Sequence, residues 1–466
     1  MRPPGPSHRG APEYARRLGL FDGTMLVMGG IIGAGIFLNP AIVAQRVGSG
    51  VLTVGVWVIG GVIALAGAFC FAELGARRPR AGGGYVYLRD ALGTLPAFLY
   101  GWTLLLVIAT GAIAAVAVTF ARYAAVLVGL GERSVVPLAI GAIVILSVIN
   151  YLGVRPGAVT QNIFTVLKLV ALAGIVVLGL TITRIPSTPV SGPVSLPHPS
   201  GSSGLAAAIG VALIPVLFAY GGWQQTNFVA EEIIEPERTL PRALILGVAG
   251  VVLVYVMANI VYVRQLGVQG LADSLAPAAD VMTRTVGRHG ATFIAAGIAV
   301  STVGFLNLVI LVTPRVYQAM ARDGVFFRRA AQLHGRYRTP SVAIVFQAAW
   351  AILLTLSGTY GQLLDYVVFG DWIFFGLCGA TVVVFRYREP NGGRDLSIGF
   401  RTPGYPWVPG LFVLAALYVV VSSVLSNPAN AAIGSGLILL GLPAFWLWSR
   451  SATRPAQDTE PEGLSR

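Results

Sequence analysis

Charged residues are scarce in this chain. Only 11% of its 466 residues are Asp, Glu, Lys or Arg, whereas 55% are hydrophobic. Charged residues make up roughly 25% of an ordinary soluble domain, so this composition excludes that class. Apolar runs of about 20 residues, the length that crosses a bilayer, recur roughly a dozen times. We therefore expect an all-α polytopic membrane protein with about 12 transmembrane helices.

Residues that ligate metals or form disulfides are also rare. The two cysteines, Cys70 and Cys378, stand far apart in apolar runs, and none of the four histidines falls inside an expected span. This pattern gives no disulfide framework and no metal or haem spacing. No Ser, His or Cys stands beside a base in a recognisable catalytic motif, so we expect no cofactor, no metal and no enzymatic activity.

The basic residues are distributed unevenly along the chain. A net charge of +13 favours nucleic acid as a partner in a soluble protein, but in a membrane protein it first reports topology. With the N-terminus inside, 23 arginines fall on one face of the membrane and 7 on the other. Residues 1–15 lack the apolar segment of a cleavable signal peptide. We expect a multi-pass protein of the cytoplasmic (inner) membrane with both termini cytoplasmic and no nucleic-acid partner.

Two apolar segments are interrupted by glycine near their middle. These are GGIIGAGIF (Gly29 to Phe37) and FAYGGW (Phe218 to Trp223). An unwound helix leaves backbone groups that no water can satisfy, so such a break persists only where it lines a cavity or binds something. Broken segments at matching positions of two halves are typical of secondary transporters. The sequence therefore predicts the binding site at these breaks.

The positions of the breaks suggest how the chain is divided. If the first ten spans form two halves of five, each half begins with a broken segment, and the repeat is inverted because five is odd. The expected divisions are a cytoplasmic tail (1–19), a first five-helix repeat (20–184), an external loop (185–204), a second five-helix repeat (205–388), two further helices (389–450) and a C-terminal tail (451–466).

Each break offers backbone groups of one polarity. Gly33, Ala34 and Gly35 present N–H groups at the start of a half-helix, where the helix dipole favours a carboxylate. Carbonyl groups from Phe218 to Gly221 lose their helical partners and can accept from an ammonium group. Together the breaks would hold an α-amino acid by its two charged ends. The alternative is that these glycines belong to a helix-packing motif.

Two aromatic residues flank the second break. Phe218 or Trp223 could close over a bound substrate like a lid, and ordinary packing is the equal alternative.

One lysine lies deep in an apolar span. Lys168 is about eleven residues after Gly157, roughly 16 Å along a helix, so its side chain cannot reach either interface. It needs polar partners, such as the freed carbonyls of the first break. Arg315, in contrast, lies near a span end, and we expect its guanidinium to reach the interface.

The acidic residues are expected at span ends. Glu73, Glu231 and Glu232 fall at inner ends near arginines, where gate or loop salt bridges are favoured over proton carriers. Asp280, Asp365 and Asp371 fall at or near outer ends. With no carboxylate expected at the midplane, a polycationic substrate is disfavoured.

Several of these segments resemble one transporter family. GGIIGAGIF, FAELGARRPRAGGGYVYLRDALG (Phe71 to Gly93), FAYGGWQQTNFVAEEIIEPERTLPRAL (Phe218 to Leu244) and STVGFLNLVILVTPRVYQAMARDG (Ser301 to Gly324) are similar to spans of the amino acid–polyamine–organocation superfamily. Within it, the chain resembles the L-type amino acid transporters and their bacterial exchanger relatives over about residues 15 to 450.

The resemblance implies a fold and a set of site residues. The fold is a ten-helix inverted-repeat core, like that of the bacterial leucine transporter, with two extra helices. The substrate carboxylate would meet the amides of Gly33, Ala34 and Gly35. Its ammonium would meet the carbonyls of Ile31, Phe218 and Gly221, and Phe218 would be the gating aromatic. Lys168 matches the lysine that replaces a sodium ion in this family, with Ser301 beside it, which implies sodium-independent transport.

The chain departs from the family pattern in three places. Ala34 stands where serine is common, and Gln224 where asparagine is frequent. The loop from Gly131 to Ser134 has no cysteine, so no disulfide-linked heavy subunit is expected. We expect a stand-alone permease, monomeric or a weak homo-oligomer.

The leading hypothesis is a sodium-independent carrier of neutral L-amino acids that works by alternating access, as an exchanger or a proton symporter. A carrier of basic amino acids or polyamines is the nearest alternative, and a carboxylate facing the cavity would support it. An amino acid receptor that does not transport is the alternative from another class. A channel is disfavoured because no ring of charges or filter sequence is present.

Overall fold

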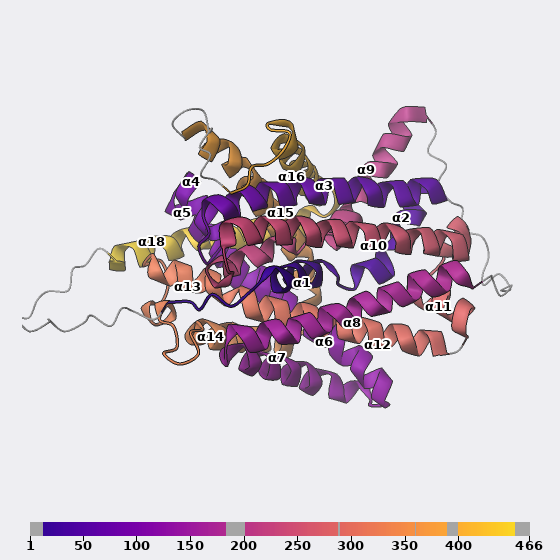
Figure 1. Ribbon diagram of the computed structural model, residues 1–466, viewed down its shortest axis with the longest axis horizontal. Coiled ribbons are helices and arrows are strands. Elements are labelled where there is room, and N and C mark those ends of the chain that lie inside the picture. Colours follow the sequence, from indigo (N-terminus) through magenta and orange to yellow (C-terminus); the bar gives the residue numbers. More distant parts are fainter. Residues whose placement is uncertain (1–12, 183–200, 288, 359, 389–398, 453–466) are drawn as a thin grey trace, which may run out of the picture.

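The protein is a bundle of helices, several of which lie side by side along its length (Figure 1). The structure is a computed structural model that describes residues 13–182, 201–287, 289–358, 360–388 and 399–452, without the side chains of 201–203, 360–368 and 449–452. In the first half of the chain the elements are α1 (Leu20–Ile31), α2 (Gly35–Val47), α3 (Gly50–Arg77), α4 (Gly84–Leu92), α5 (Thr94–Thr103), η1 (Leu104–Ile108), α6 (Ala109–Val128), η2 (Glu132–Ser134), α7 (Val135–Tyr151) and α8 (Val154–Thr181).

The second half of the described chain is also helical. Its elements are α9 (Gly201–Ala219), η3 (Trp223–Glu232), α10 (Pro236–Ala272), α11 (Pro277–Val286), α12 (His289–Val312), α13 (Pro314–Arg322), η4 (Arg328–Ala331), α14 (Ser341–Ser357), α15 (Tyr360–Arg388), α16 (Trp407–Ser426), α17 (Pro428–Leu439) and α18 (Gly441–Ala452). Within the described ranges the chain forms no β-strand, only an isolated bridge between Leu18 and Ile233.

The all-α membrane architecture is confirmed. By length and composition, ten helices of the described chain can cross a membrane, or up to eleven if the bent pair α1 and α2 is one span. The expected count of twelve is reached only if α14 is added, which is apolar but shorter, at 17 residues. The expected tails and the external loop (185–204) fall largely outside the described residues.

Both expected breaks are present, and they differ in form. Helices α1 and α2 meet at a bend of 45°. Helix α9 ends at Ala219, and after Gly222, whose φ is +110°, the chain continues as the 3-10 helix η3. The chain after the second break is therefore wound more tightly than an α-helix.

Small residues allow α10 to approach the first helices of the chain. A methyl group at Gly23 of α1 would lie 3.0 Å from the Cβ of Ala243, and one at Gly247 would lie 2.5 Å from Val27. Lipid tails are as apolar as the side chains, so close contact between backbones is a main source of helix association in a membrane. The contact fixes α1, and therefore the first break, against α10.

Ion pairs tie the helices together at the end of the bundle where α3 ends at Arg77 and α15 at Arg388, called the arginine-rich end here. Glu73 is buried and accepts from Arg77 and from Arg386 (2.6 Å), and also from the backbone N–H of Thr402. Arg322 lies 3.6 Å from Glu231. The expectation of salt bridges for these two glutamates is confirmed.

The position of Arg315 differs from the expectation. Its guanidinium was expected to reach the interface, but it is fully buried and its Nε donates to Glu232 at 2.7 Å. Backbone N–H groups of Arg17 and Leu18 donate to the carbonyl oxygen of Glu232 at 2.8 and 3.0 Å. The N-terminal segment therefore folds over this ion pair and covers it. Position along the span could not show this, because the covering segment precedes the first helix.

Substituting Gly247→Val tests the contact between α1 and α10. The new side chain would overlap Val27, and overpacking of this kind costs about 1–3 kcal/mol. We expect a lower melting temperature for the purified protein in detergent. The control is Gly141→Val in α7, where a Cβ meets nothing within 4 Å. Equal melting temperatures for the two variants would contradict the contact.

Candidate functional site

The two broken segments touch each other. A methyl group at Gly222 would overlap the carbonyl oxygen of Gly30, and one at Gly30 would lie 2.8 Å from the carbonyl oxygen of Gly222. Only glycine allows the two backbones to approach this closely, and the positive φ of Gly222 also favours it. The contact itself is made by Gly30 and Gly222.

The carbonyl groups released by the first break have side-chain donors. The Lys168 ammonium donates to the carbonyl oxygens of Gly29 and Ile32, both at 2.8 Å, and the Ser301 hydroxyl donates to Ile32 at 3.0 Å. Both side chains are fully buried. Lys168 therefore has the polar partners that its depth demanded. The two side chains join α8 and α12 to the end of α1.

Tyr255 of α10 is a site residue that the sequence did not reveal. Its hydroxyl lies 3.1 Å from the carbonyl oxygen of Ile31 and 3.4 Å from that of Ala219, so it bridges the two breaks. Its ring packs within an aromatic group with Trp57 and Tyr220, at centroid distances of 5.6 and 5.1 Å. No motif could identify Tyr255, because its role depends on which face of α10 meets the breaks.

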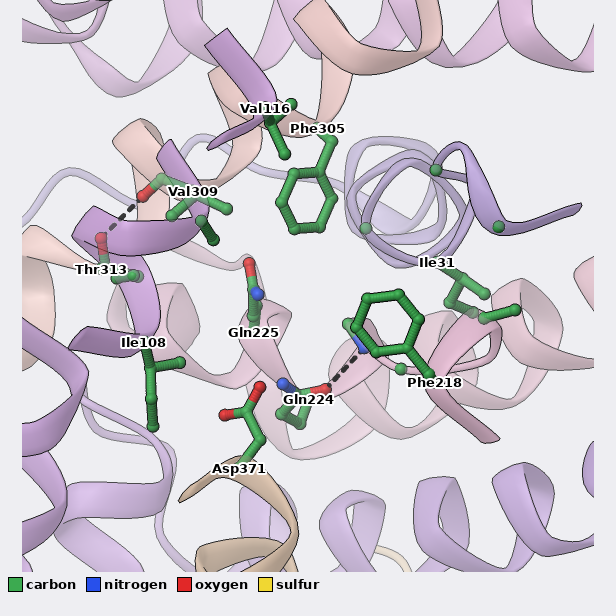
Figure 2. A pocket seen from close by; sticks show the side chains of 18 of the residues that line it. Ile31, Ile108, Val116, Phe218, Gln224, Gln225, Phe305, Val309, Thr313 and Asp371 are labelled. Carbon is green, nitrogen blue, oxygen red and sulfur yellow. Dashed lines mark hydrogen bonds between the residues drawn. The ribbon is translucent and has the colours of Figure 1, made fainter. Parts of the chain in front are cut away.

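A cavity of about 250 Å³ opens beside the breaks. All six residues predicted to bind substrate line it: Ile31, Gly33, Ala34, Gly35, Phe218 and Gly221. Figure 2 shows this cavity with Phe305, Val309 and Thr313 of the α12 region on its far side. The predicted residues are therefore brought together in space. Lys168 and Ser301 lie behind the first break and do not line the cavity.

The two aromatic residues of the second break point in different directions. Phe218 lines the cavity and is 46% exposed, so its ring is not closed over the space. Trp223 is 3% exposed and packs on Phe71, with ring centroids 5.0 Å apart, and on Phe412 at 5.9 Å. In this conformation Trp223 is a packing residue, and Phe218 is the one placed to act as a lid.

The position of Asp371 also differs from the expectation. It was expected at or near the outer end of its span, but it lines the same cavity as Gly33 and Gly221. It is eleven residues into α15, about 16 Å along the helix. Position along the span could not show this, because the cavity is formed by faces of helices that are distant in the sequence. The side chain of Asp365 lies outside the described residues.

Gln224 lies between Asp371 and the second break. Its Oε1 accepts from the backbone N–H of Gly222 at 3.0 Å, and Figure 2 shows its amide nitrogen on the side of Asp371. The amide thus lies between the carboxylate and the unwound backbone. This residue was noted in the sequence only as a departure from a common asparagine.

The cavity combines N–H donors, carbonyl acceptors and apolar walls. The first N–H groups of α2, at Gly35 and after, have no partner within their helix and carry the positive end of its dipole. The carbonyls of Ile31 and Phe218 each have one donor, Tyr255 and the N–H of Gly221, which leaves a second lone pair on each. The arrangement suits a small ligand with a carboxylate and an ammonium group.

Comparison with known proteins gives consistent matches. Residues 18–448 match a family described as "Amino acid permease". The chain is 31% identical over 455 residues to the b(0,+)-type amino acid transporter 1 of Mus musculus, covering 94% of this chain and 91% of that one. It is 32% identical to the large neutral amino acids transporter small subunit 2 of Homo sapiens (96% and 82% covered) and 30% identical to the human cystine/glutamate transporter (94% and 86%).

Tyr255→Phe tests the bridge between the breaks. Loss of the hydroxyl leaves buried carbonyls short of a donor, at a cost of about 1–3 kcal/mol, so the melting temperature in detergent should fall. Tyr262→Phe is the matched control, because Tyr262 lies on the same helix and its buried hydroxyl has no hydrogen-bond partner in the structure. If both variants melt at the same temperature, the bridge does not contribute to stability.

Proposed function

The chain belongs to the amino acid permease family, and from that premise we propose that it is a sodium-independent carrier of neutral L-amino acids. It works by alternating access across the cytoplasmic membrane, either as an exchanger or as a proton symporter. Amino acid transport is common to the named relatives. Sodium independence and the preference for neutral substrates are the proposed refinements.

One observation carries the proposal. The N–H groups of Gly33, Ala34 and Gly35 and the carbonyls of Ile31, Phe218 and Gly221 line a single cavity. The α-carboxylate of the substrate binds the N–H groups, where the dipole of α2 favours negative charge. The α-ammonium binds the carbonyls. The apolar walls from α6 and α12 receive the side chain.

Sodium independence is inferred from Lys168. Its ammonium group donates to two carbonyls of the first break at 2.8 Å, which are the hard oxygen ligands that a sodium ion would need. The side-chain ammonium group stabilises these carbonyls in place of an ion. Ser301 supplies the second donor to Ile32.

Alternating access needs two ends that open in turn. At the arginine-rich end, buried ion pairs of Glu73 and Glu232 hold the helices together, and we infer from them that this end is closed. We place it in the cytoplasm, from the distribution of arginines. Closure of Phe218 over the substrate, followed by separation of these ion pairs, would release substrate on that side.

The carrier is proposed to act without a disulfide-linked heavy subunit. Cys70 and Cys378 are free and buried inside the bundle. Neither thiol is placed to form a bridge to another chain.

Transport in proteoliposomes tests the proposal. The purified protein is reconstituted with or without internal unlabelled alanine, serine and leucine, and uptake of the labelled amino acids is measured with sodium, without sodium and with a pH gradient. Uptake that ignores sodium and requires internal substrate indicates exchange, and uptake into empty vesicles driven by the pH gradient indicates proton symport. Binding without uptake would favour the alternative of a receptor that does not transport. Sodium-dependent uptake would contradict the role of Lys168.

The role of Lys168 predicts a graded loss. Lys168→Ala removes a charged donor from two buried carbonyls, worth about 1.5–3 kcal/mol, and should reduce sodium-free uptake roughly tenfold or more. Ser301→Ala removes one neutral donor, worth about 1 kcal/mol, and should reduce it about fivefold. Both are measured as initial rates at equal amounts of reconstituted protein. Unchanged uptake in Lys168→Ala would contradict a role of this lysine in transport.

A further inference from the structure

Asp371 is the one charged side chain among the described residues that line the central cavity. It is half-buried, and none of the described residues forms a hydrogen bond or an ion pair with its carboxylate. A carboxylate at membrane depth is costly and marks a functional site by default. Among the described residues, no basic side chain lines the cavity with it.

Lys168, the basic side chain beside the first break, is already engaged. It donates to Gly29 and Ile32 behind the break and does not line the cavity. The other polar side chains among the described lining residues are neutral: Gln224, Gln225 and Thr313 among them. A ligand with a terminal cation would therefore supply the charge partner that this lining lacks.

A second acceptor on the same wall is also without a partner. The Oε1 atom of Gln225 is buried and makes no hydrogen bond, although Gln225 lines the cavity. A buried acceptor that lacks a donor is costly. Gln224, in contrast, is held by the N–H of Gly222. The wall therefore presents two unused acceptors, a carboxylate and an amide oxygen, and both favour a ligand with several N–H donors.

The position of Asp371 matches the far end of a ligand held at the breaks. In Figure 2 the Asp371 carboxylate and the Phe218 ring lie on opposite sides of Gln224. Apolar side chains, Ile108 and Val309 among them, line the same cavity. A substrate bound by its α-groups at the breaks can lay a methylene chain along these walls and bring a terminal cation to Asp371.

We propose that Asp371, with Gln225, forms a side-chain subsite for the guanidinium or ammonium group of a cationic L-amino acid. The subsite rests on the proposed function, because the α-carboxylate and α-ammonium still bind at the two breaks. It extends the substrate range from neutral to cationic amino acids of the arginine and ornithine type. A glutamate side chain is rejected, because its carboxylate would face that of Asp371.

Competition between matched ligands tests the subsite. Uptake of a labelled neutral amino acid is measured with L-arginine or L-citrulline as competitor, since citrulline has almost the same shape but an uncharged urea end. Charge-assisted hydrogen bonds are roughly twice as strong as neutral ones, so arginine should compete about tenfold better than citrulline. In Asp371→Asn this preference should fall to about one, with citrulline unchanged. Asp371→Glu should retain part of the preference.

Asp273→Asn is the control, because Asp273 is a partly buried carboxylate at the end of α10 that does not line the cavity. It should keep the arginine preference. Agmatine, which is arginine without its carboxylate, should compete poorly. Equal competition by agmatine and arginine would overturn the subsite in favour of a polyamine site.

Two results separate this subsite from the proposed function. Neutral uptake with no arginine preference in the unaltered protein overturns the subsite alone. The absence of uptake of any amino acid overturns both. If Asp371→Asn does not fold, the strength of competition by arginine relative to citrulline in the unaltered protein still tests the subsite. Equal weakening of both competitors in a folded Asp371→Asn also overturns the subsite.

Discussion

Backbone groups released at two helix breaks, in a region without water, are the constraint on which the rest of this structure depends. Gly30 and Gly222 allow the breaks to touch, and every such carbonyl in contact with the bundle needs a donor. Lys168 and Ser301 supply donors behind the first break, and Tyr255 supplies one between the two. The groups that remain free line the cavity. The proposed binding site therefore consists of the backbone groups that remain after the breaks have been stabilised.

The cavity has two kinds of wall, because the free backbone groups lie only at the breaks. One wall is mainly backbone and, in the proposed function, would recognise features that all α-amino acids share. The other wall is made of side chains from α6, α12 and α15 and would determine which substrate side chain is accepted. Asp371 and Val309 lie on that wall, outside the breaks. Relatives named for neutral amino acids and for cystine and glutamate are consistent with one backbone wall serving several specificities.

Much of this could be predicted from the sequence, because some residue types have few permitted roles in a membrane. Glycines inside an apolar run predicted the breaks, and the depth of Lys168 predicted carbonyl partners. Asp371, Tyr255 and Arg315 could not be placed, because their roles depend on which faces of distant helices meet. Arg315 is covered by a segment that precedes the first helix, and Asp371 faces a cavity formed mostly by residues of other helices, far away in the sequence. Their positions along the sequence do not predict these contacts.

An experimental structure with a bound amino acid tests the central claim most directly. The account predicts ligand density between α2 and η3, with the carboxylate within hydrogen-bonding distance of the N–H groups of Gly33, Ala34 and Gly35 and the ammonium at the carbonyls of Ile31, Phe218 and Gly221. The Lys168 ammonium should remain on Gly29 and Ile32, with no ion beside it. Density for the amino acid elsewhere in the bundle, or an ion bound to these carbonyls with Lys168 displaced, would contradict the account.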